Sequence, residues 1–230
     1  MTIPARVGDT RDARGEETRQ RLLAAALSAF GARGYDGVST RELARAAGVN
    51  QAAIVYHFGG KEALYTTVAD HVAAHGRAAL APLLDRGTSD PPSTRAAALT
   101  QLAAALHGLV RGLLDLADDG AAAAFVLREQ THPGPGFPPL YDGYIRPLHE
   151  HVTRLVAAAT ERSPNAVETV VDAHAVVGLA LGFAVARATL LRRTGWEAYT
   201  PARIDQIADR VAHLACRALA GGGGRIDDRS

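Results

Sequence analysis

Apolar residues recur at helical spacing along almost the whole chain. The first such face has the spacing i, i+1, i+4, i+5 and i+8 and consists of Leu22, Leu23, Ala26, Leu27 and Phe30. Glu16 and Glu17 precede it, where the helix dipole favours acidic side chains, and Gly31 and Gly34 follow it. The pattern therefore predicts a first helix that begins near Glu16 and ends at these glycines.

Capping and turn residues divide the rest of the chain into further helices. Ser39 with Glu42 three residues later is a capping box, and Ser163-Pro164 and Thr200-Pro201 each place a proline at a helix start. Two stretches are expected to be irregular: residues 85–93, and residues 132–139, which hold four prolines and two glycines. The predicted helices cover residues 39–47, 50–58, 61–80, 94–116, 121–130, 140–162, 164–192 and 201–220.

These patterns predict an all-α fold of about nine helices with no strand, in which a small helical bundle precedes a larger one. Residues 1–15 and the glycine-led tail 221–230 are expected to be disordered. The low aromatic share of 5% further disfavours an all-β fold, because strands are enriched in aromatic and β-branched side chains.

Composition excludes several classes of protein. The 230 residues carry 25 basic and 24 acidic side chains, so the chain is not a generally basic nucleic-acid coat protein. The single cysteine, Cys216, permits no intrachain disulfide, which suits a reducing compartment. The longest apolar run, residues 175–186, is too short to span a bilayer, and the first residues lack the apolar core of a signal peptide. A cytoplasmic protein without a membrane segment is expected.

The stretch STRELARAAGVNQAAIVYHFGGK, residues 39–61, holds two short predicted helices separated by a glycine turn, as in a helix-turn-helix. Leu43, Ala47, Val49 and Ile54 are expected to lock the two helices together. Polar groups remain on the outside, where hydroxyls, an amide and cations are suited to phosphates and base edges. From spacing alone, a helical hairpin with a solvated polar face explains the pattern equally well.

The stretch from about Thr18 to Leu64, which includes these two helices, resembles the DNA-binding domain of the TetR/AcrR family of bacterial transcriptional regulators. The short segment that leads from the family's first helix to its helix-turn-helix appears as Gly34 to Ser39. The family's second helix appears as Thr40 to Val49, and its recognition-helix signature as Val55 to Leu64. The resemblance is gapless over about a fifth of the chain. Val55 departs from it, because a tyrosine is frequent at that position.

The resemblance implies a role for individual residues. Thr40, Tyr56, His57 and Lys61, the only lysine of the chain, would contact phosphates, and Arg41 would read a guanine. Base-reading positions fall on the residues after the turn. The DNA-binding set predicted in this way is Thr40, Arg41, Asn50, Gln51, Ala52, Ala53, Tyr56, His57 and Lys61.

The resemblance also divides the chain into a DNA-binding domain, residues 16–64, and an effector-binding and dimerisation domain, residues 65–220. The stretch from Phe125 to Gln130, together with Leu140, Tyr141 and Tyr144, is similar to the CecR-type subgroup. The predicted effector pocket mixes aromatic and polar residues: Phe125, Arg128, Glu129, Tyr141, Tyr144, His149, His174 and Phe183. For each of them, ordinary core or surface packing is the alternative, and Arg128 with Glu129 is equally well read as a surface ion pair.

Small residues recur every four positions on one apolar helix, and an apolar stripe runs along the last helix. We expect the two helices to form a four-helix interface with those of a second copy, although packing within one chain is the alternative. The predicted interface residues are Gly178, Gly182, Ala186, Ile207, Val211 and Leu214.

Enzymatic chemistry finds little support in the sequence. His71 and His75 have a spacing that zinc can use, but no carboxylate completes a site, and Cys216 has no evident base partner. No metal, cofactor or catalytic residue is predicted. The expected protein is a dimeric repressor that binds palindromic double-stranded operator DNA and is released by a small-molecule effector. The rival hypothesis is a helical small-molecule-binding or metal-dependent enzyme.

Overall fold

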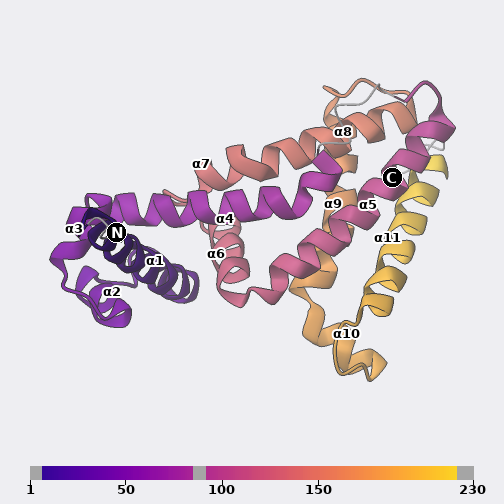
Figure 1. Ribbon diagram of the computed structural model, residues 1–230. Helices are drawn as coiled ribbons and strands as arrows, with labels where there is room; N and C mark the ends of the chain where they lie inside the picture. Colours follow the sequence, from indigo (N-terminus) through magenta and orange to yellow (C-terminus); the bar gives the residue numbers. More distant parts are fainter. Residues whose placement is uncertain (1–6, 85–91, 222–230) are drawn as a thin grey trace, which may run out of the picture. The chain divides into compact units, whose positions relative to one another are not determined.

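The computed structural model describes residues 7–84 and 92–221, all of whose regular elements are helical (Figure 1). The α-helices are α1 (Val7–Arg33), α2 (Thr40–Ala47), α3 (Ala52–Phe58), α4 (Lys61–Leu84), α5 (Arg95–Asp118), α6 (Gly120–Thr131), α7 (Phe137–Leu140), α8 (Arg146–Thr160), α9 (Val167–Val185), α10 (Arg187–Thr194) and α11 (Pro201–Gly221). A π-helical turn, η2 (Tyr141–Ile145), joins α7 to α8. The all-α prediction is confirmed.

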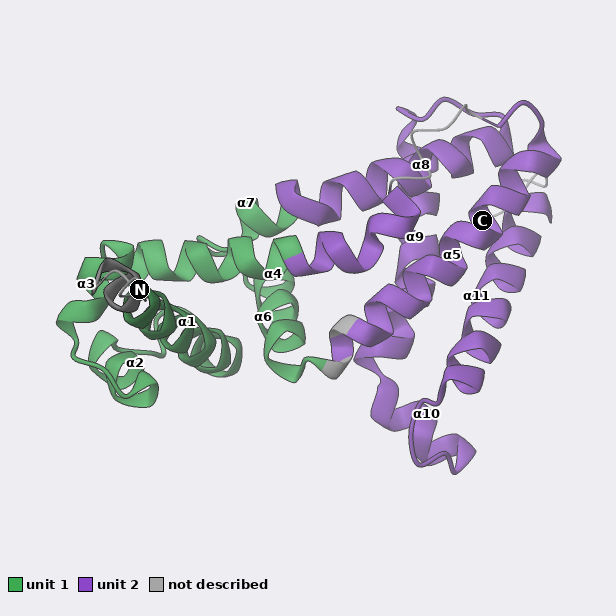
Figure 2. Ribbon diagram, in the orientation of Figure 1, with its two compact units in different colours: residues 1–74, 119–141 green, residues 75–118, 142–230 purple. Residues whose placement is uncertain are grey.

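The helices form two compact units (Figure 2). The N-terminal unit comprises residues 1–74 and 119–141, and the C-terminal unit comprises residues 75–118 and 142–230. Helix α4 runs through the predicted boundary after Leu64, and α6 packs with α1 in the N-terminal unit. An added Cβ at Gly31 of α1 would lie 2.7 Å from the carbonyl oxygen of Ala121, so a glycine is required where α1 and α6 approach each other.

The first helix is longer than expected, since α1 begins at Val7 rather than near Glu16. Residues 7–15 are predicted from the sequence to belong to a polar, disordered N-terminal arm. Once a helix is nucleated downstream, however, adding residues to its end costs little free energy. The remaining residues of the arm, 1–6, and of the tail, 222–230, lie outside the described residues, as do residues 85–91 of the predicted irregular stretch.

Two helices predicted as continuous are interrupted. Pro147 has no N–H, and in a continuous α-helix its ring would clash with the carbonyl of Gly143; the chain instead passes through the π-helical turn η2 before α8 begins. Part of the predicted proline-rich loop is also helical, as α7. The second break lies between α9 and α10, where the Tyr199 hydroxyl donates a 3.1 Å hydrogen bond to the Phe183 carbonyl. That carbonyl would accept the Arg187 N–H in a continuous helix.

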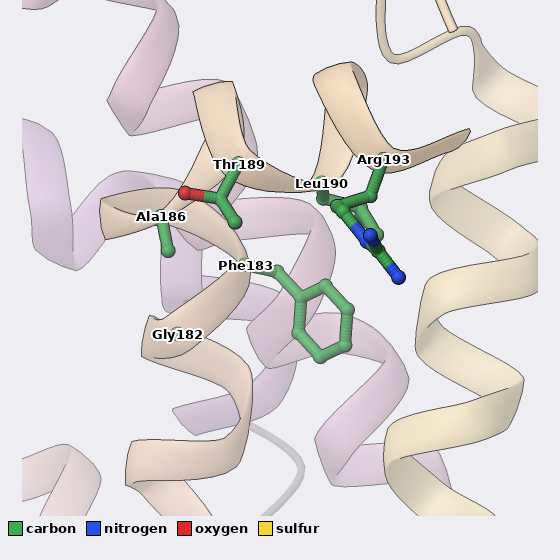
Figure 3. A pocket seen from close by; sticks show the side chains of 6 residues that line it. All are labelled: Gly182, Phe183, Ala186, Thr189, Leu190 and Arg193. Atoms are coloured by element: carbon green, nitrogen blue, oxygen red, sulfur yellow. The ribbon is translucent and has the colours of Figure 1, made fainter. Parts of the chain in front are cut away.

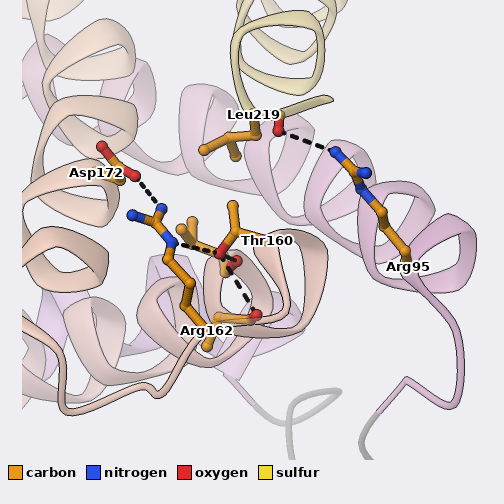
Figure 4. A network of polar contacts seen from close by, with 7 residues as sticks. Arg95, Thr160, Arg162, Asp172 and Leu219 are labelled. Atoms are coloured by element: carbon orange, nitrogen blue, oxygen red, sulfur yellow. Dashed lines mark hydrogen bonds and ion pairs between the residues drawn. The ribbon is translucent and has the colours of Figure 1, made fainter. Parts of the chain in front are cut away.

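The core of the C-terminal unit centres on α5, which packs against α8, α9 and α11. Polar contacts tie the ends of these helices together (Figure 4). The Arg162 guanidinium pairs with Asp172, and its Nε donates a 3.1 Å hydrogen bond to the Thr160 hydroxyl. Arg95 donates to the carbonyl oxygens of Leu219, at 3.3 Å, and Ala220, at 2.9 Å, and so caps the end of α11.

Candidate nucleic-acid interface

The start of α2 is fixed by the predicted capping box. The Glu42 N–H donates to the Ser39 hydroxyl at 3.2 Å, and the Ser39 N–H donates to the Glu42 carboxylate at 2.8 Å. Arg33, at the end of α1, donates to the same carboxylate at 2.8 Å. Hydrogen bonds from Arg33 and then from Ser39 lower the pKa of Glu42 to about 2. This carboxylate therefore joins the end of α1 to the start of α2.

The turn between α2 and α3 depends on a glycine and an asparagine. Gly48 has a φ of 65°, a left-handed conformation that ends α2, and the Val49 N–H donates back to the Ala44 carbonyl. The Asn50 side-chain oxygen accepts the Ala52 N–H at 2.9 Å, so it satisfies a free donor at the start of α3. Leu43, Ala47 and Ile54 are buried, as expected of residues that hold α2 and α3 together, and so is Ala44, whereas Val49 is only half-buried.

Most of the predicted DNA-binding residues lie on the accessible surface of α2, α3 and the start of α4. Arg41, Asn50, Gln51 and Ala52 are exposed, and Tyr56 is 84% exposed. The other four are half-buried: Thr40, Ala53, His57 and Lys61. The Gln51 amide donates a 2.8 Å hydrogen bond to the Thr40 hydroxyl across the turn. The structure thus brings the start of α2 and the start of α3 together in one polar surface.

Aromatic rings position two cations at the edge of this surface. The Lys61 ammonium lies 4.2 Å from the centroid of the Tyr35 ring, and the Arg19 guanidinium lies 5.4 Å from the centroid of the Phe58 ring. The Arg19 contact was not predicted, because α1 and the end of α3 are distant in sequence. Together with Arg41, these cations supply charged donors suited to phosphates and to guanine edges.

Val55 adds an exposed apolar group beside Tyr56. In sequence, this valine stands out only as the absence of a tyrosine that is frequent at its position in the family. Its exposed methyl groups, like those of Ala52, are of the kind that contacts the thymine methyl group in a major groove. The surface therefore offers placed cations, an amide and methyl groups, while lacking the dense positive charge of a nonspecific binder.

The predicted effector-pocket residues are divided between the two compact units. Phe125 and Glu129 are buried in the N-terminal unit, where the Glu129 carboxylate accepts hydrogen bonds from the Tyr65 hydroxyl and the Gly134 N–H. Arg128 is not paired with Glu129 but donates to the Ala32 carbonyl at 3.1 Å. Tyr141, which was also predicted for the pocket, is exposed and stacks on Phe137. These contacts are those of a packed core and its surface.

The other predicted pocket residues lie in the C-terminal unit. His149 and His174 stack, with Nε2 of the first 3.1 Å from Nδ1 of the second, and burial and then His174 lower the pKa of His149. Tyr144 is buried, with its ring packed over Gly76. Phe183 lines a shallow hollow of about 320 Å³ with Gly182, Ala186, Thr189, Leu190 and Arg193 (Figure 3).

The predicted dimer residues divide by burial. Gly178, Gly182 and Ala186 are exposed, with open space around the Cα atoms of both glycines, and Leu214 is 43% exposed. Ile207 and Val211, by contrast, are only 3% and 1% exposed. These two residues face the core of their own unit, where α11 packs on α5, so they must be removed from the predicted interface.

The rest of the described chain offers little for catalysis. Within residues 7–84 and 92–221, no three or more His, Cys, Asp or Glu side chains form a group that could hold a metal ion. Burial raises the pKa of the Cys216 thiol, which contacts the Leu99 carbonyl. Two helices, spanning Arg95–Asp115 and Val167–Val185, have the length and apolar composition of membrane spans. The first is half buried in the unit core, as expected of a core helix.

Comparisons with known proteins match both parts of the chain. A family model described as bacterial regulatory proteins, tetR family, matches residues 22–68, and one described as the C-terminal domain of the HTH-type transcriptional dual regulator CecR matches residues 98–222. The chain is 34% identical over 201 residues to the HTH-type transcriptional dual regulator CecR of Shigella flexneri. The match covers 86% of this chain and 89% of that protein. It is 47% identical over 49 residues to the regulator SrpR of Pseudomonas putida, covering 21% and 23% of the two chains.

Solved structures share the fold. A TetR-like regulator from Rhodococcus sp. RHA1 superposes with a TM-score of 0.61 at 23% identity, covering 96% of this chain and 100% of that chain. A TetR family member from Streptomyces coelicolor A3 gives a TM-score of 0.56 at 24% identity, covering 87% and 90%.

The fold, the helix-turn-helix and these matches define a bacterial transcriptional regulator rather than an enzyme. The chain belongs to the TetR family and carries a C-terminal domain of the CecR type.

Proposed function

We propose that this regulator binds palindromic operator DNA as a homodimer in the cytoplasm, represses transcription there, and is released by a small-molecule effector. The observation that carries the proposal is the polar surface formed by α2, α3 and the start of α4. Its exposed side chains come from a helix-turn-helix whose second helix, α3, is of the kind that enters a major groove.

In the proposed complex, base and backbone contacts come from different parts of the surface. Thr40, Tyr56, His57 and Lys61 contact phosphates, as the family resemblance implies, and they position α3 on the duplex. Arg41 reads a guanine, while Gln51, Ala52 and Ala53 read base edges and methyl groups. Asn50 serves first to hold the turn before α3, because its side-chain oxygen accepts the Ala52 N–H.

A second copy of the chain is proposed to cover α9. An exposed stripe with alternating spacings of four and three residues runs along this helix through Val167, Val171, His174, Gly178, Leu181 and Val185. Large apolar side chains left in water are a common mark of a protein interface. Gly178, Gly182, Ala186 and Leu214 therefore stay in the proposed interface, whereas Ile207 and Val211 do not. Two-fold symmetry then presents two α3 helices to a palindromic site.

Release by an effector requires two states of the dimer that differ in the spacing of the two DNA-binding domains. An effector that binds one state more tightly shifts the population toward that state by its differential affinity. Repression follows where the operator overlaps a promoter, since the bound dimer blocks the polymerase.

The experiment is footprinting on the intergenic DNA beside the protein's own gene, followed by fluorescence anisotropy on the protected fragment at several salt concentrations. We expect a protected palindrome and an affinity well above that for a scrambled fragment of equal length. Equal affinity for both fragments would reject sequence-specific operator binding. Transcription in vitro from the same promoter then tests repression, because added protein must lower the transcript yield.

A further inference from the structure

A second cavity, of about 450 Å³, lies within the C-terminal unit and is lined by none of the residues first predicted as the effector pocket. Its wall is mostly aliphatic and comes from the end of α4, the middle of α5 and α8. The apolar part of the wall consists of Pro82, Leu83, Ala104, Ala105, Gly108 and Leu155, and its polar side chains are Gln101, His107 and His151. The volume lies in the range of small-molecule sites.

His151 is the unusual member of this wall. Its side chain is only 7% exposed, and it makes no hydrogen bond to any described residue. A polar group in a mostly apolar wall gains from a hydrogen-bond partner, which a ligand or a water molecule in the cavity can supply. Burial and then the charge of Arg154 lower the pKa of His151, which favours the neutral ring with its one donor and one acceptor.

His107 differs from His151 because one of its ring nitrogens already has a partner within the protein. Its Nε2 lies 3.1 Å from a carboxylate oxygen of Asp209 on α11. Among the residues that line the cavity, none is an Asp, Glu, Lys or Arg. A charged ligand would therefore meet no Asp, Glu, Lys or Arg side chain in the wall itself, which is unfavourable in an apolar site.

We propose that this cavity is the effector site and that it takes an uncharged, mostly apolar molecule carrying a hydroxyl group that hydrogen-bonds to His151. The proposal rests on the effector-responsive function proposed above. An uncharged hydrocarbon would contact the aliphatic wall of the cavity but would offer the His151 imidazole no hydrogen-bond partner. A hydroxyl both donates and accepts, so it satisfies either nitrogen of a neutral imidazole.

The test uses three probes with the same methylphenyl body: p-cresol, toluene and 4-methylbenzoate. Binding to the full-length protein is measured without DNA, by titration of the histidine ring signals in NMR spectra and by thermal shift. We expect p-cresol to perturb the ring of His151 and to bind about tenfold more tightly than toluene, as one net hydrogen bond implies. We expect the carboxylate to bind more weakly than either.

Variants locate the site and its polar contact. His151→Leu should abolish the preference for p-cresol over toluene, His151→Gln should retain much of it, and His71→Leu, at an exposed position on α4, should leave it unchanged. Gly108→Leu should weaken both probes, because an added Cβ there is only in ordinary contact with Leu83, at 3.7 Å, and a longer side chain fills the cavity.

Equal binding of p-cresol and toluene, or p-cresol binding that survives both His151→Leu and Gly108→Leu, would overturn the proposal. Failure of all three probes to bind at millimolar concentration would overturn it as well. Because the titrations contain no DNA, these outcomes leave operator binding to be judged separately. Conversely, a protein that fails to protect its operator but binds p-cresol through His151 would lose only the proposed DNA function.

Discussion

The Tyr65 hydroxyl donates a 2.5 Å hydrogen bond to Oε1 of Glu129 in the interior of the N-terminal unit. Glu129 is 1% exposed, and its second oxygen accepts the Gly134 N–H at 3.0 Å. An added Cβ at Gly136 would lie within about 3.1 Å of Phe125, Tyr65 and Glu129, so the chain beyond α6 is closely packed over the pair. The contact ties α6 to the first turns of α4, directly after the recognition helix.

Tyr65→Phe is expected to lower the free energy of unfolding by about 1–3 kcal/mol, because a buried carboxylate oxygen loses its donor while the core volume is nearly unchanged. Urea unfolding of the full-length protein measures this. Tyr35→Phe is the matched control, since Tyr35 is half-buried and contributes through its ring to the contact with Lys61. A change below about 0.5 kcal/mol in Tyr65→Phe, equal to that of the control, would mean that the hydrogen bond does not stabilise the unit.

The helix-turn-helix was predictable because its signals are local. The Ser39–Glu42 capping box, the left-handed Gly48 and the hydrogen bond of the Asn50 side chain to the Ala52 N–H each act within a few residues of their own position. The apolar positions Leu43 and Ile54 then need only helical spacing to be assigned to the core. Sequence periodicity therefore identified both the elements and the outward face of this part of the chain.

The features that the sequence did not reveal depend on distant partners. The break after α9 involves a hydrogen bond from Tyr199 to the Phe183 carbonyl. No residue within the predicted helix indicates that the helix is interrupted there. Likewise, an apolar stripe predicts that Ile207 is covered, but not whether α5 of the same chain or a second copy covers it. The cavity at His107 and His151 requires α4, α5 and α8 to be placed in space, so a list of polar residues in helices was not enough to find it.

Lys61→Ala is expected to weaken binding to all DNA sequences alike, because a phosphate contact carries no sequence information. Anisotropy titrations over a range of salt concentrations should give a slope of log affinity against log salt that is smaller by about one per site. Arg77→Ala, which removes an exposed cation outside the proposed surface, should leave affinity and slope unchanged. An unchanged slope for Lys61→Ala would remove Lys61 from the phosphate contacts.

Arg41→Ala is expected to change sequence preference more than overall affinity for nonspecific DNA. A bidentate contact of arginine to guanine gives about 1–3 kcal/mol of discrimination against other bases. Affinity for operator variants with each base in turn should therefore become nearly uniform at one position of each half-site. If the substitution weakens binding to every variant by the same factor, Arg41 contacts the backbone instead.

Gly178→Glu is expected to convert the dimer to a monomer at micromolar concentration, because it places a charge in the exposed apolar stripe of α9. Open space around the Gly178 Cα allows the side chain to be accommodated within the single chain, so the circular dichroism spectrum should be unchanged. Gly120→Glu introduces the same side chain at an equally open position in the first turn of α6. Sedimentation velocity compares the two variants. A Gly178→Glu protein that remains dimeric would place the interface elsewhere.

The Glu42 carboxylate gives the helix-turn-helix an acid-sensitive contact whose pH window can be stated. Its pKa in the folded protein is about 2, against roughly 4.3 in an unfolded chain. Because the folded-state value is the lower one, the contact contributes its full stability above about pH 5 and loses it as the pH falls toward 2. Glu42→Gln removes the titrating group, so the difference in unfolding free energy between wild type and variant should be constant near neutrality and shrink progressively below pH 5. Glu17→Gln, at an exposed position of α1, is the control for general charge effects. A difference that stays constant down to pH 3 would mean that Arg33 and Ser39 do not stabilise the ionised carboxylate.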